Sequence, residues 1–519
     1  MKLDDKIETT DSMFRPTLVL MSGRMFSFVA TFFIPVVLVR IFAPDEFGTY
    51  KQVFLVYMTV YAIAQMGMAE SLFYFLPRAP QEGGRYVFNS LLMLLVAAAV
   101  FAGALVQEKA KISELLSNSG LAQHFPLLGL YLLFMTASAT LEIVMISRKQ
   151  YSRAALTYIS SDMVRAVVFI LPALVLHDLR ALFLGAVAFA IFRFGVTVVY
   201  CWQEFGNEFR ADAGLLRQQL AYALPFAMAV VVETLQANVH QYAVSHHFDA
   251  ATFAIYSIGC LQIPLVEFLA SPAGNVMMVR MSEEIRDGRS ESVISLWHET
   301  TRKLALIFFP LFGLLLATAG DLIVVLFTST YAASIPIFMI WSATILLSAL
   351  QTDSALRVYA QTRFLFVLNV VRLLVIVALI YASMSVFGLL GAVLVTLLSS
   401  AIAKGLSLAK LKRDMNVRTA QLLPWRSLAV IGAISIAAYL IALAGKSALD
   451  VSALPRLLIV GIVYVASYTL LLLRSGLLSV RERRALTNWR HRLAGVGFRG
   501  GRVQKQLKEE KPCAALSEL

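Results

Sequence analysis

The chain carries little charge for its length. Only 15% of its 519 residues are charged, 59% are hydrophobic, and the mean hydropathy is +0.74. A soluble protein of this size needs more charge on its surface, and soluble core helices usually keep a polar face. Apolar stretches recur along most of the chain, and each is long enough to cross a bilayer core of about 30 Å as a helix. The composition therefore predicts an all-α, polytopic membrane protein.

Signatures of enzymes, metal centres and disulfide frameworks are also missing. The three cysteines lie far apart and form no cluster. Gly445-Lys446-Ser447 lacks the earlier glycine of a phosphate-binding loop, and His298-Glu299 lacks the second histidine of a zinc-binding helix. No nucleophile with a neighbouring base stands out. We therefore expect no cofactor, no metal and no catalysis, which predicts a transporter and not an enzyme.

The apolar stretches predict about fourteen membrane spans. They cover residues 16–42, 49–76, 86–106, 125–147, 154–176, 181–203, 218–244, 251–279, 304–328, 334–352, 364–384, 387–409, 427–445 and 457–473. The first sixteen residues, MKLDDKIETTDSMFRP, are acidic and polar and lack the basic start of a cleaved signal peptide. We expect the first span to stay as an uncleaved anchor.

Lysine and arginine are distributed unevenly around these spans. Most of them fall at the two ends of the chain and in every second connection, whereas the connections at 245–250, 329–333 and 385–386 contain none. Because basic loops stay in the cytoplasm, this asymmetry predicts a protein of the cytoplasmic (inner) membrane with both termini in the cytoplasm. The net charge of +13 then reflects membrane topology, so we expect a lipid bilayer and no nucleic acid as partner.

Short segments recur at a nearly constant offset of 206 or 207 residues. The pairs are FAPDEFGTY at 42–50 with FDAATFAIY at 248–256, LGAV at 184–187 with LGAV at 390–393, and DMVR at 162–165 with NVVR at 369–372. Three pairs at one offset predict an internal duplication. Six spans per copy is an even number, so the two copies should be parallel repeats. The predicted units are 1–210 and 211–415, two additional helices in 416–474, and a basic cytoplasmic tail in 475–519.

The N-terminal motif resembles that of a known family. Its positions are Arg40, Pro44, Glu46, Phe47, Gly48, Tyr50, Gly67 and Arg78. This motif and the six-plus-six-plus-two arrangement resemble the Wzx-type polysaccharide and O-antigen flippases of the multidrug/oligosaccharidyl-lipid/polysaccharide exporter superfamily. The resemblance implies a MATE-like fold. It also implies transport of an undecaprenyl-pyrophosphate-linked oligosaccharide, with glycosyltransferases or a polymerase as further partners.

Four arginines lie inside predicted spans, namely Arg24, Arg165, Arg193 and Arg372. An ionised group at mid-bilayer costs about 2.5–3.5 kcal/mol on insertion scales, so each arginine needs a partner, water or an anionic ligand. We predict that they line a substrate cavity between the halves, where Arg165 and Arg372 occupy equivalent positions of the repeat. The alternative is that they form structural ion pairs, because Asp162 lies three residues before Arg165.

Carboxylates also lie inside the predicted spans. Asp162, Glu233 and Glu267 are candidates for coupling transport to protons or Na⁺, whereas Glu70 and Glu142 lie near cytoplasmic ends where they can reach water. The main prediction is a flippase for a lipid-linked oligosaccharide in surface polysaccharide biosynthesis. Three alternatives stay open: a lipid II flippase, an ion-coupled multidrug antiporter with an acidic cavity, and a scaffold that organises polysaccharide enzymes through its basic tail.

Overall fold

The computed structural model describes residues 4–447 and 449–477, and every regular element in that part of the chain is a helix. Thirteen segments are long and apolar enough to cross a membrane, or fourteen if a pair that bends by 50° between residues 259 and 264 counts as one crossing. The predicted all-α polytopic fold with about fourteen spans is confirmed. The predicted basic tail lies outside the described residues from residue 478 onward.

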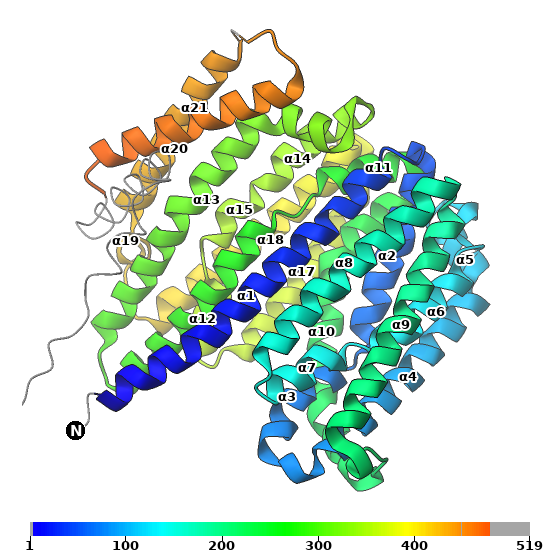
Figure 1. The fold of residues 1–519 in the computed structure, drawn as a ribbon. Coiled ribbons are helices and arrows are strands. Elements are labelled where there is room, and N and C mark those ends of the chain that lie inside the picture. The colour runs from blue at the N-terminus through cyan, green and yellow to red at the C-terminus, as the bar shows by residue number, and fades with distance from the viewer. Residues whose placement is uncertain (1–3, 448, 478–519) are drawn as a thin grey trace, which may run out of the picture.

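The first group of helices makes six crossings (Figure 1). It contains α1 (Asp4–Leu38), α2 (Pro44–Ala64), α3 (Met68–Arg78), η1 (Pro80–Glu82), α4 (Gly83–Gln107), α5 (Lys109–Leu115), η2 (Ser119–Leu121), α6 (Phe125–Ala137), α7 (Thr140–Ser147), α8 (Tyr151–Leu176), α9 (Leu179–Phe205) and η3 (Gly206–Glu208). The second crossing is split into α2 and α3, where Met66 and Gly67 adopt positive φ, and the fourth into α6 and α7.

The second group repeats this plan. It contains α10 (Ala213–His247), α11 (Ala250–Gly259), α12 (Pro264–Arg286), α13 (Ser290–Phe327), η4 (Ser329–Ser334), α14 (Ile335–Ser342), α15 (Thr344–Ser348), α16 (Thr352–Val358), α17 (Thr362–Phe387) and α18 (Leu389–Asp414). Its second and fourth crossings are again split. The fourth breaks at Ala343, 205 residues after Ser138 at the corresponding break of the first group. The predicted boundaries at 210/211 and 415/416 fall between helices, and the division into domains stays a prediction.

Two further crossings pack on the outside of the second group. They are α20 (Trp425–Ser447) and α21 (Ala453–Arg474), which follow the short α19 (Thr419–Leu422) and lie against α13 (Figure 1). A buried carboxylate of α13 holds both of them: Asp321 forms ion pairs with Lys446 at 2.8 Å and with Arg456 at 2.6 Å. Because the carboxylate lies inside a membrane-spanning helix, this ion-paired triad fixes the added helices in place.

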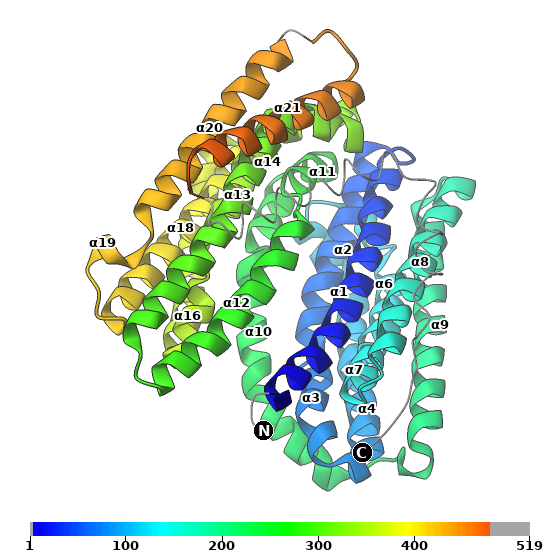
Figure 2. The same cartoon turned by 60° about the vertical axis from the view of Figure 1, so that its left-hand side comes forward.

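The echoed segments at 42–50 and 248–256 pack directly against each other, through α2 and α11. A Cβ at Gly48 would lie 1.8 Å from the carbonyl oxygen of Ala250, so only glycine fits there. Phe47 and Phe253 are fully buried around this contact. The recurrent sequence pattern therefore marks a place where the two groups of helices touch. On the side of the second group, α10 and α11 face the first group (Figure 2).

Hydrogen bonds between the groups surround this contact, which we call the α2–α11 end. The guanidinium of Arg40 donates to the carbonyl oxygens of Val325 at 2.6 Å and Leu326 at 2.7 Å. These carbonyls belong to the last turn of α13, where helical partners are lacking. The buried amide of Gln52 donates to the hydroxyl of Ser245 at 2.7 Å. Arg40 and Gly48 of the N-terminal motif, together with Gln52, thus hold the two groups together at one end of the molecule.

At the opposite end, the connection between α9 and α10 is tied to the start of α4. Arg85 pairs with Glu208 at 3.0 Å and with Asp212 at 3.3 Å. Asp212 also caps α10, and the backbone N–H groups of Leu215 and Gly214, together with Arg85, hold the pKa of its carboxyl below the usual range. These contacts fix how the second group starts relative to the first.

Candidate functional site

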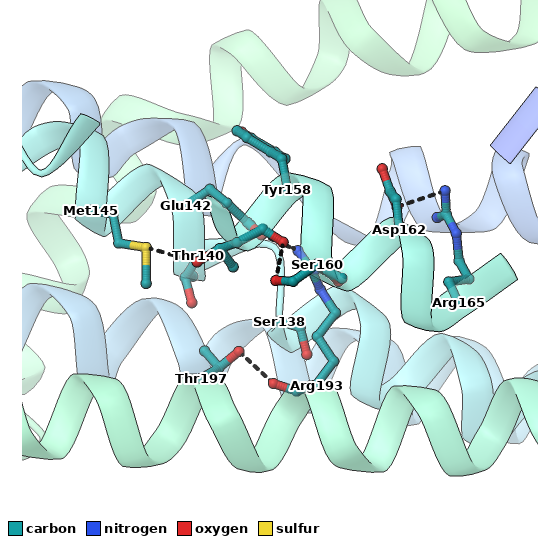
Figure 3. Close-up of polar contacts among 12 residues, drawn as sticks. Ser138, Thr140, Glu142, Met145, Tyr158, Ser160, Asp162, Arg165, Arg193 and Thr197 are labelled. Carbon is teal, nitrogen blue, oxygen red and sulfur yellow. Dashed lines mark hydrogen bonds and ion pairs between the residues drawn. The ribbon is translucent and has the colours of Figure 1, made fainter. Parts of the chain in front are cut away.

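Arg193 of α9 is held in a buried ion pair with Glu142 of α7. One guanidinium nitrogen lies 2.7 and 2.8 Å from the two carboxylate oxygens, and the side chains are only 14% and 4% exposed (Figure 3). The other terminal nitrogen donates to the hydroxyl of Ser161. This geometry leaves little room for a ligand, so Arg193 has the environment of a structural ion pair. The expectation that Glu142 reaches water is wrong, because Arg193 and the surrounding helices cover it.

Arg165 and Asp162 form an ion pair within α8. Their closest atoms are 2.9 Å apart, which is the pairing that their three-residue spacing allows (Figure 3). The side chains are 26% and 21% exposed, so this pair remains more accessible than the one at Arg193. A ligand anion can compete with Asp162 for the Arg165 guanidinium here.

Arg24 differs from Arg165 and Arg193 because no carboxylate in the described residues pairs with it. It lies in the apolar span Leu20–Leu38 of α1 and is exposed. Its guanidinium donates to the hydroxyl of Tyr158 on α8 at 3.3 Å and lies 5.2 Å from the centre of that ring. Gly23 allows α1 to pack closely on α8, since a Cβ there would lie 2.9 Å from that of Ala155. The arginine is thus positioned by aromatic contact but keeps its charge available.

Arg372 lies in a different place, a polar pocket within the second group. The pocket has a volume of about 460 Å³ and is enclosed by α10, α12, α15, α16, α17 and α18. Arg372 donates to the hydroxyl of Ser400 at 2.9 Å, while its Nε atom is buried without a partner. No contact between Arg372 and Arg165 is present in the described residues. The structure therefore divides the predicted site residues between two places.

The polar pocket contains charges of both signs in equal number. Its carboxylates are Glu233, Glu267 and Asp353, and its cations are Arg357, Arg372 and Lys404. Lys404 is anchored, with its ammonium 2.9 Å from the hydroxyl of Thr352 and 3.3 Å from the carboxylate of Asp353. Glu233 and Glu267 are exposed to the pocket and make no hydrogen bond within the described residues.

An apolar groove runs between α13 and α21. Its volume is about 800 Å³. It is lined by leucine, isoleucine, valine, alanine and glycine with only two threonines, Thr318 and Thr469. Such a surface suits a hydrocarbon chain and offers almost nothing to a polar group.

Several residues of these sites were missed in the sequence. Asp353 and Arg357 were placed in a loop between spans, but they lie on α16, which folds against the pocket. Lys404 interrupts an apolar run near the end of a span, and Asp321 does the same in α13. Such isolated charges inside apolar runs could have identified both as functional or ion-paired residues. Within residues 4–447 and 449–477, no group of three His, Cys, Asp or Glu side chains is arranged to hold a metal ion.

Comparison with known proteins identifies the family. The family model described as "polysaccharide biosynthesis protein" matches residues 37–336, more than half of the chain. No curated protein sequence matches the chain.

Solved structures share the fold at low sequence identity. The lipid II flippase MurJ in an inward closed conformation superposes with a TM-score of 0.67 and 12% identity, over 86% of this chain and 98% of that one. An inward-facing multidrug resistance MATE family transporter of the MOP superfamily gives 0.62 and 13%, over 77% and 98%. A MOP superfamily transporter from Pyrococcus furiosus gives 0.54 and 11%, over 77% and 95%. The chain therefore belongs to the polysaccharide biosynthesis protein family and is a multi-pass membrane protein that shares its fold with MurJ and with MATE transporters.

Proposed function

We propose that the protein is a flippase for a lipid-linked oligosaccharide of the undecaprenyl-pyrophosphate type. It carries this lipid from the cytoplasmic to the outer leaflet of the cytoplasmic membrane for surface polysaccharide biosynthesis. The observation that carries the proposal is Arg24, an exposed cation in an apolar span with no carboxylate partner among the described residues. A charge inside a span is costly, by about 2.5–3.5 kcal/mol at its centre, and an anionic headgroup is a ligand that offsets such a cost.

The other predicted arginines support the proposal unequally. Arg165 can exchange Asp162 for a phosphate oxygen because the pair is accessible. Arg372 contributes from the polar pocket. Arg193, buried with Glu142, is proposed to hold α7 and α9 together so that Arg165 on the neighbouring α8 stays in position. Substrate contact is therefore assigned first to Arg24, then to Arg165 and Arg372.

Energetics and lipid chemistry are consistent with this function. With the cell interior negative, outward movement of an anion is downhill by about 2.3 kcal/mol per charge per 100 mV, so ATP hydrolysis is not required. The isoprenoid chain can remain in an apolar environment during transfer, and the groove between α13 and α21 supplies one. The headgroup and the lipid tail thus have separate surfaces.

Coupling to an ion is proposed for Glu233 and Glu267. Both carboxylates face the polar pocket without a hydrogen-bond partner in the described residues, so they can exchange a proton or a sodium ion. Asp162, the third predicted candidate, is engaged by Arg165 and is the weakest of the three.

A lipid II flippase is the second candidate, because the MurJ structure covers 86% of this chain. Restored growth of cells that lack their own lipid II flippase would favour lipid II over the oligosaccharide as substrate.

Two other functions are less consistent with the site. A multidrug antiporter for cations should show an excess of acidic side chains in its pocket, whereas the polar pocket is balanced in charge. A scaffold function, or docking of a polymerase or glycosyltransferases, is tested by removing residues 478–519, since a flippase should retain most of its activity.

Orientation can be tested separately. Reporter fusions at Asp287 and Asp414 should report the cytoplasm, and fusions at Ser245 and Ser452 the outer side, because the two pairs lie at opposite ends of the helices. A cytoplasmic signal at Ser245 contradicts the proposed topology.

The proposed function predicts a specific effect of changing Arg24. Arg24→Gln should abolish export, so that cells lose the surface polysaccharide and accumulate its lipid-linked precursor on the cytoplasmic side. Arg24→Lys should restore export in part, since lysine keeps the charge but loses the guanidinium fork. Arg180→Gln, at an exposed arginine just before the apolar part of α9, is the matched control and should export normally. Full export by an expressed and inserted Arg24→Gln protein contradicts the proposal.

A further inference from the structure

The polar pocket is poorly suited to a pyrophosphate or to an organic cation as its main ligand. It holds three carboxylates and three cations, so its formal charge is zero. A pyrophosphate in the pocket would be repelled by Glu233, Glu267 and Asp353 as well as attracted by the cations. A drug-like cation would be repelled by the three basic side chains as well as attracted by the carboxylates. Sites for apolar drugs are lined mainly by hydrophobic side chains, which this pocket is not. The balance of charges favours a ligand that is polar but uncharged.

Several uncharged polar side chains of the pocket have no partner in the described residues. The amides of Gln236, Asn275 and Asn369 make no hydrogen bond there; Gln236 is only 5% exposed, Asn369 is half-buried, and Asn275 is exposed. A largely buried polar side chain is nearly always paired with protein or water, so the amide of Gln236 is the one that most needs a ligand or water as partner. The unpartnered Nε of Arg372 adds another donor. The pocket therefore presents an unfilled set of donors and acceptors.

This set matches the hydrogen-bonding capacity of a sugar. Each hydroxyl group donates one hydrogen bond and accepts others, so a glycan needs acceptors and donors side by side. Carboxylates supply acceptors, guanidinium and ammonium groups supply donors, and amides supply both. The volume of about 460 Å³ is within the range of about 300–1,000 Å³ that is usual for small-ligand sites.

The walls of the pocket are held rigidly. Lys404 bonds to Thr352 and Asp353 and so fixes α16 against α18. On the facing helix, a Cβ at Gly274 would lie 2.5 Å from the amide oxygen of Gln351, which shows how closely α12 approaches this segment. Preorganised polar groups of this kind select between ligands, because a ligand that lacks the matching hydroxyls leaves them unpaired.

We infer that the polar pocket binds the glycan of the lipid-linked substrate, an uncharged polyhydroxylated chain, while Arg24 holds the pyrophosphate. This inference rests on the flippase function proposed above. It assigns the two parts of one headgroup to different groups of helices, and it makes the second group the part that distinguishes one oligosaccharide from another.

The test uses the full-length protein in lipid nanodiscs with two probes. One is undecaprenyl pyrophosphate without sugar, and the other is the glycan-bearing lipid extracted from cells depleted of the protein. Asn369→Leu and Gln236→Met replace amides by apolar side chains of similar size. Each should weaken binding of the glycan-bearing lipid about fivefold or more, because a sugar hydroxyl loses its hydrogen-bond partner, and should change binding of the sugar-free lipid less than twofold.

Two controls separate the possible outcomes. Asn238→Leu removes an amide of the same helix that bonds to Thr59 outside the pocket, and it should leave both affinities unchanged. Arg24→Gln should weaken both probes alike. The inference is overturned if folded pocket variants weaken both probes equally, or if they bind the glycan-bearing lipid as wild type does. If the wild-type protein binds neither probe, the proposed function itself fails.

Discussion

The contact at Gly48 gives the sharpest structural prediction. Gly48→Ala places a Cβ 1.8 Å from the carbonyl oxygen and 2.4 Å from the carbonyl carbon of Ala250, well inside the 3.4 Å at which ordinary contact begins. Both atoms are backbone, so they cannot swing away as a side chain can. Overpacking of this kind costs about 1–3 kcal/mol, which outweighs the gain of about 1 kcal/mol in helix propensity. The substitution should therefore force α2 and α11 apart.

Separation at this point should expose Ser245, which is buried and bonded to Gln52 one turn away. We expect a Ser245→Cys reporter in the purified protein to react slowly with maleimide in the wild-type background. The rate should rise with Gly48→Ala, about tenfold for a net cost of about 1.4 kcal/mol, which lies within the range given above. Cys201 and Cys260 are buried and should contribute little background, and Cys513 is replaced by serine.

Gly103→Ala is the matched control, because no atom lies within 4 Å of a Cβ at that position of α4. It should leave labelling unchanged and raise stability by up to about 1 kcal/mol. If Gly48→Ala behaves like Gly103→Ala in labelling and in thermal unfolding, the close contact between the echoed segments does not exist as described.

Three further predictions concern charged residues within the spans. Arg193→Met should lower the free energy of unfolding by about 3–5 kcal/mol because it strands the Glu142 carboxylate, and adding Glu142→Leu should restore most of it; equal melting temperatures of the single and double variants would refute this. Asp321→Asn should loosen α20 and α21 and speed hydrogen exchange in α21, whereas unchanged exchange shows that apolar packing alone holds them. Glu233→Gln with Glu267→Gln should remove any dependence of transport on pH or sodium, and a retained dependence places the coupling elsewhere.

The membrane spans were predictable because hydropathy is a local property. A run of apolar residues long enough to cross the bilayer identifies a span whatever it packs against. The breaks were not predicted, since the average over a window hides a local change such as the positive φ of Met66 and Gly67. For the same reason, residues 353–363 were assigned to a loop although α16 occupies half of them.

Contacts of the site could be predicted only between residues that lie close together in the sequence. The pair of Asp162 and Arg165 was anticipated because both lie on one helix, three residues apart. The partner of Arg193 is 51 residues away on another helix, and no local pattern indicates it. The echo between 42–50 and 248–256 indicated equivalence, but its packing through Gly48 and Ala250 depends on how the two groups of helices meet.

The central claim, transport of a lipid-linked glycan, can be measured in proteoliposomes. The glycan-bearing undecaprenyl pyrophosphate lipid is placed in both leaflets, and a membrane-impermeant periodate oxidises only the sugars that face outward. With the wild-type protein, we expect nearly all of the glycan to become oxidised, whereas Arg24→Gln and protein-free liposomes should leave about half protected. Protection of the same half in the presence of correctly inserted wild-type protein would contradict the account.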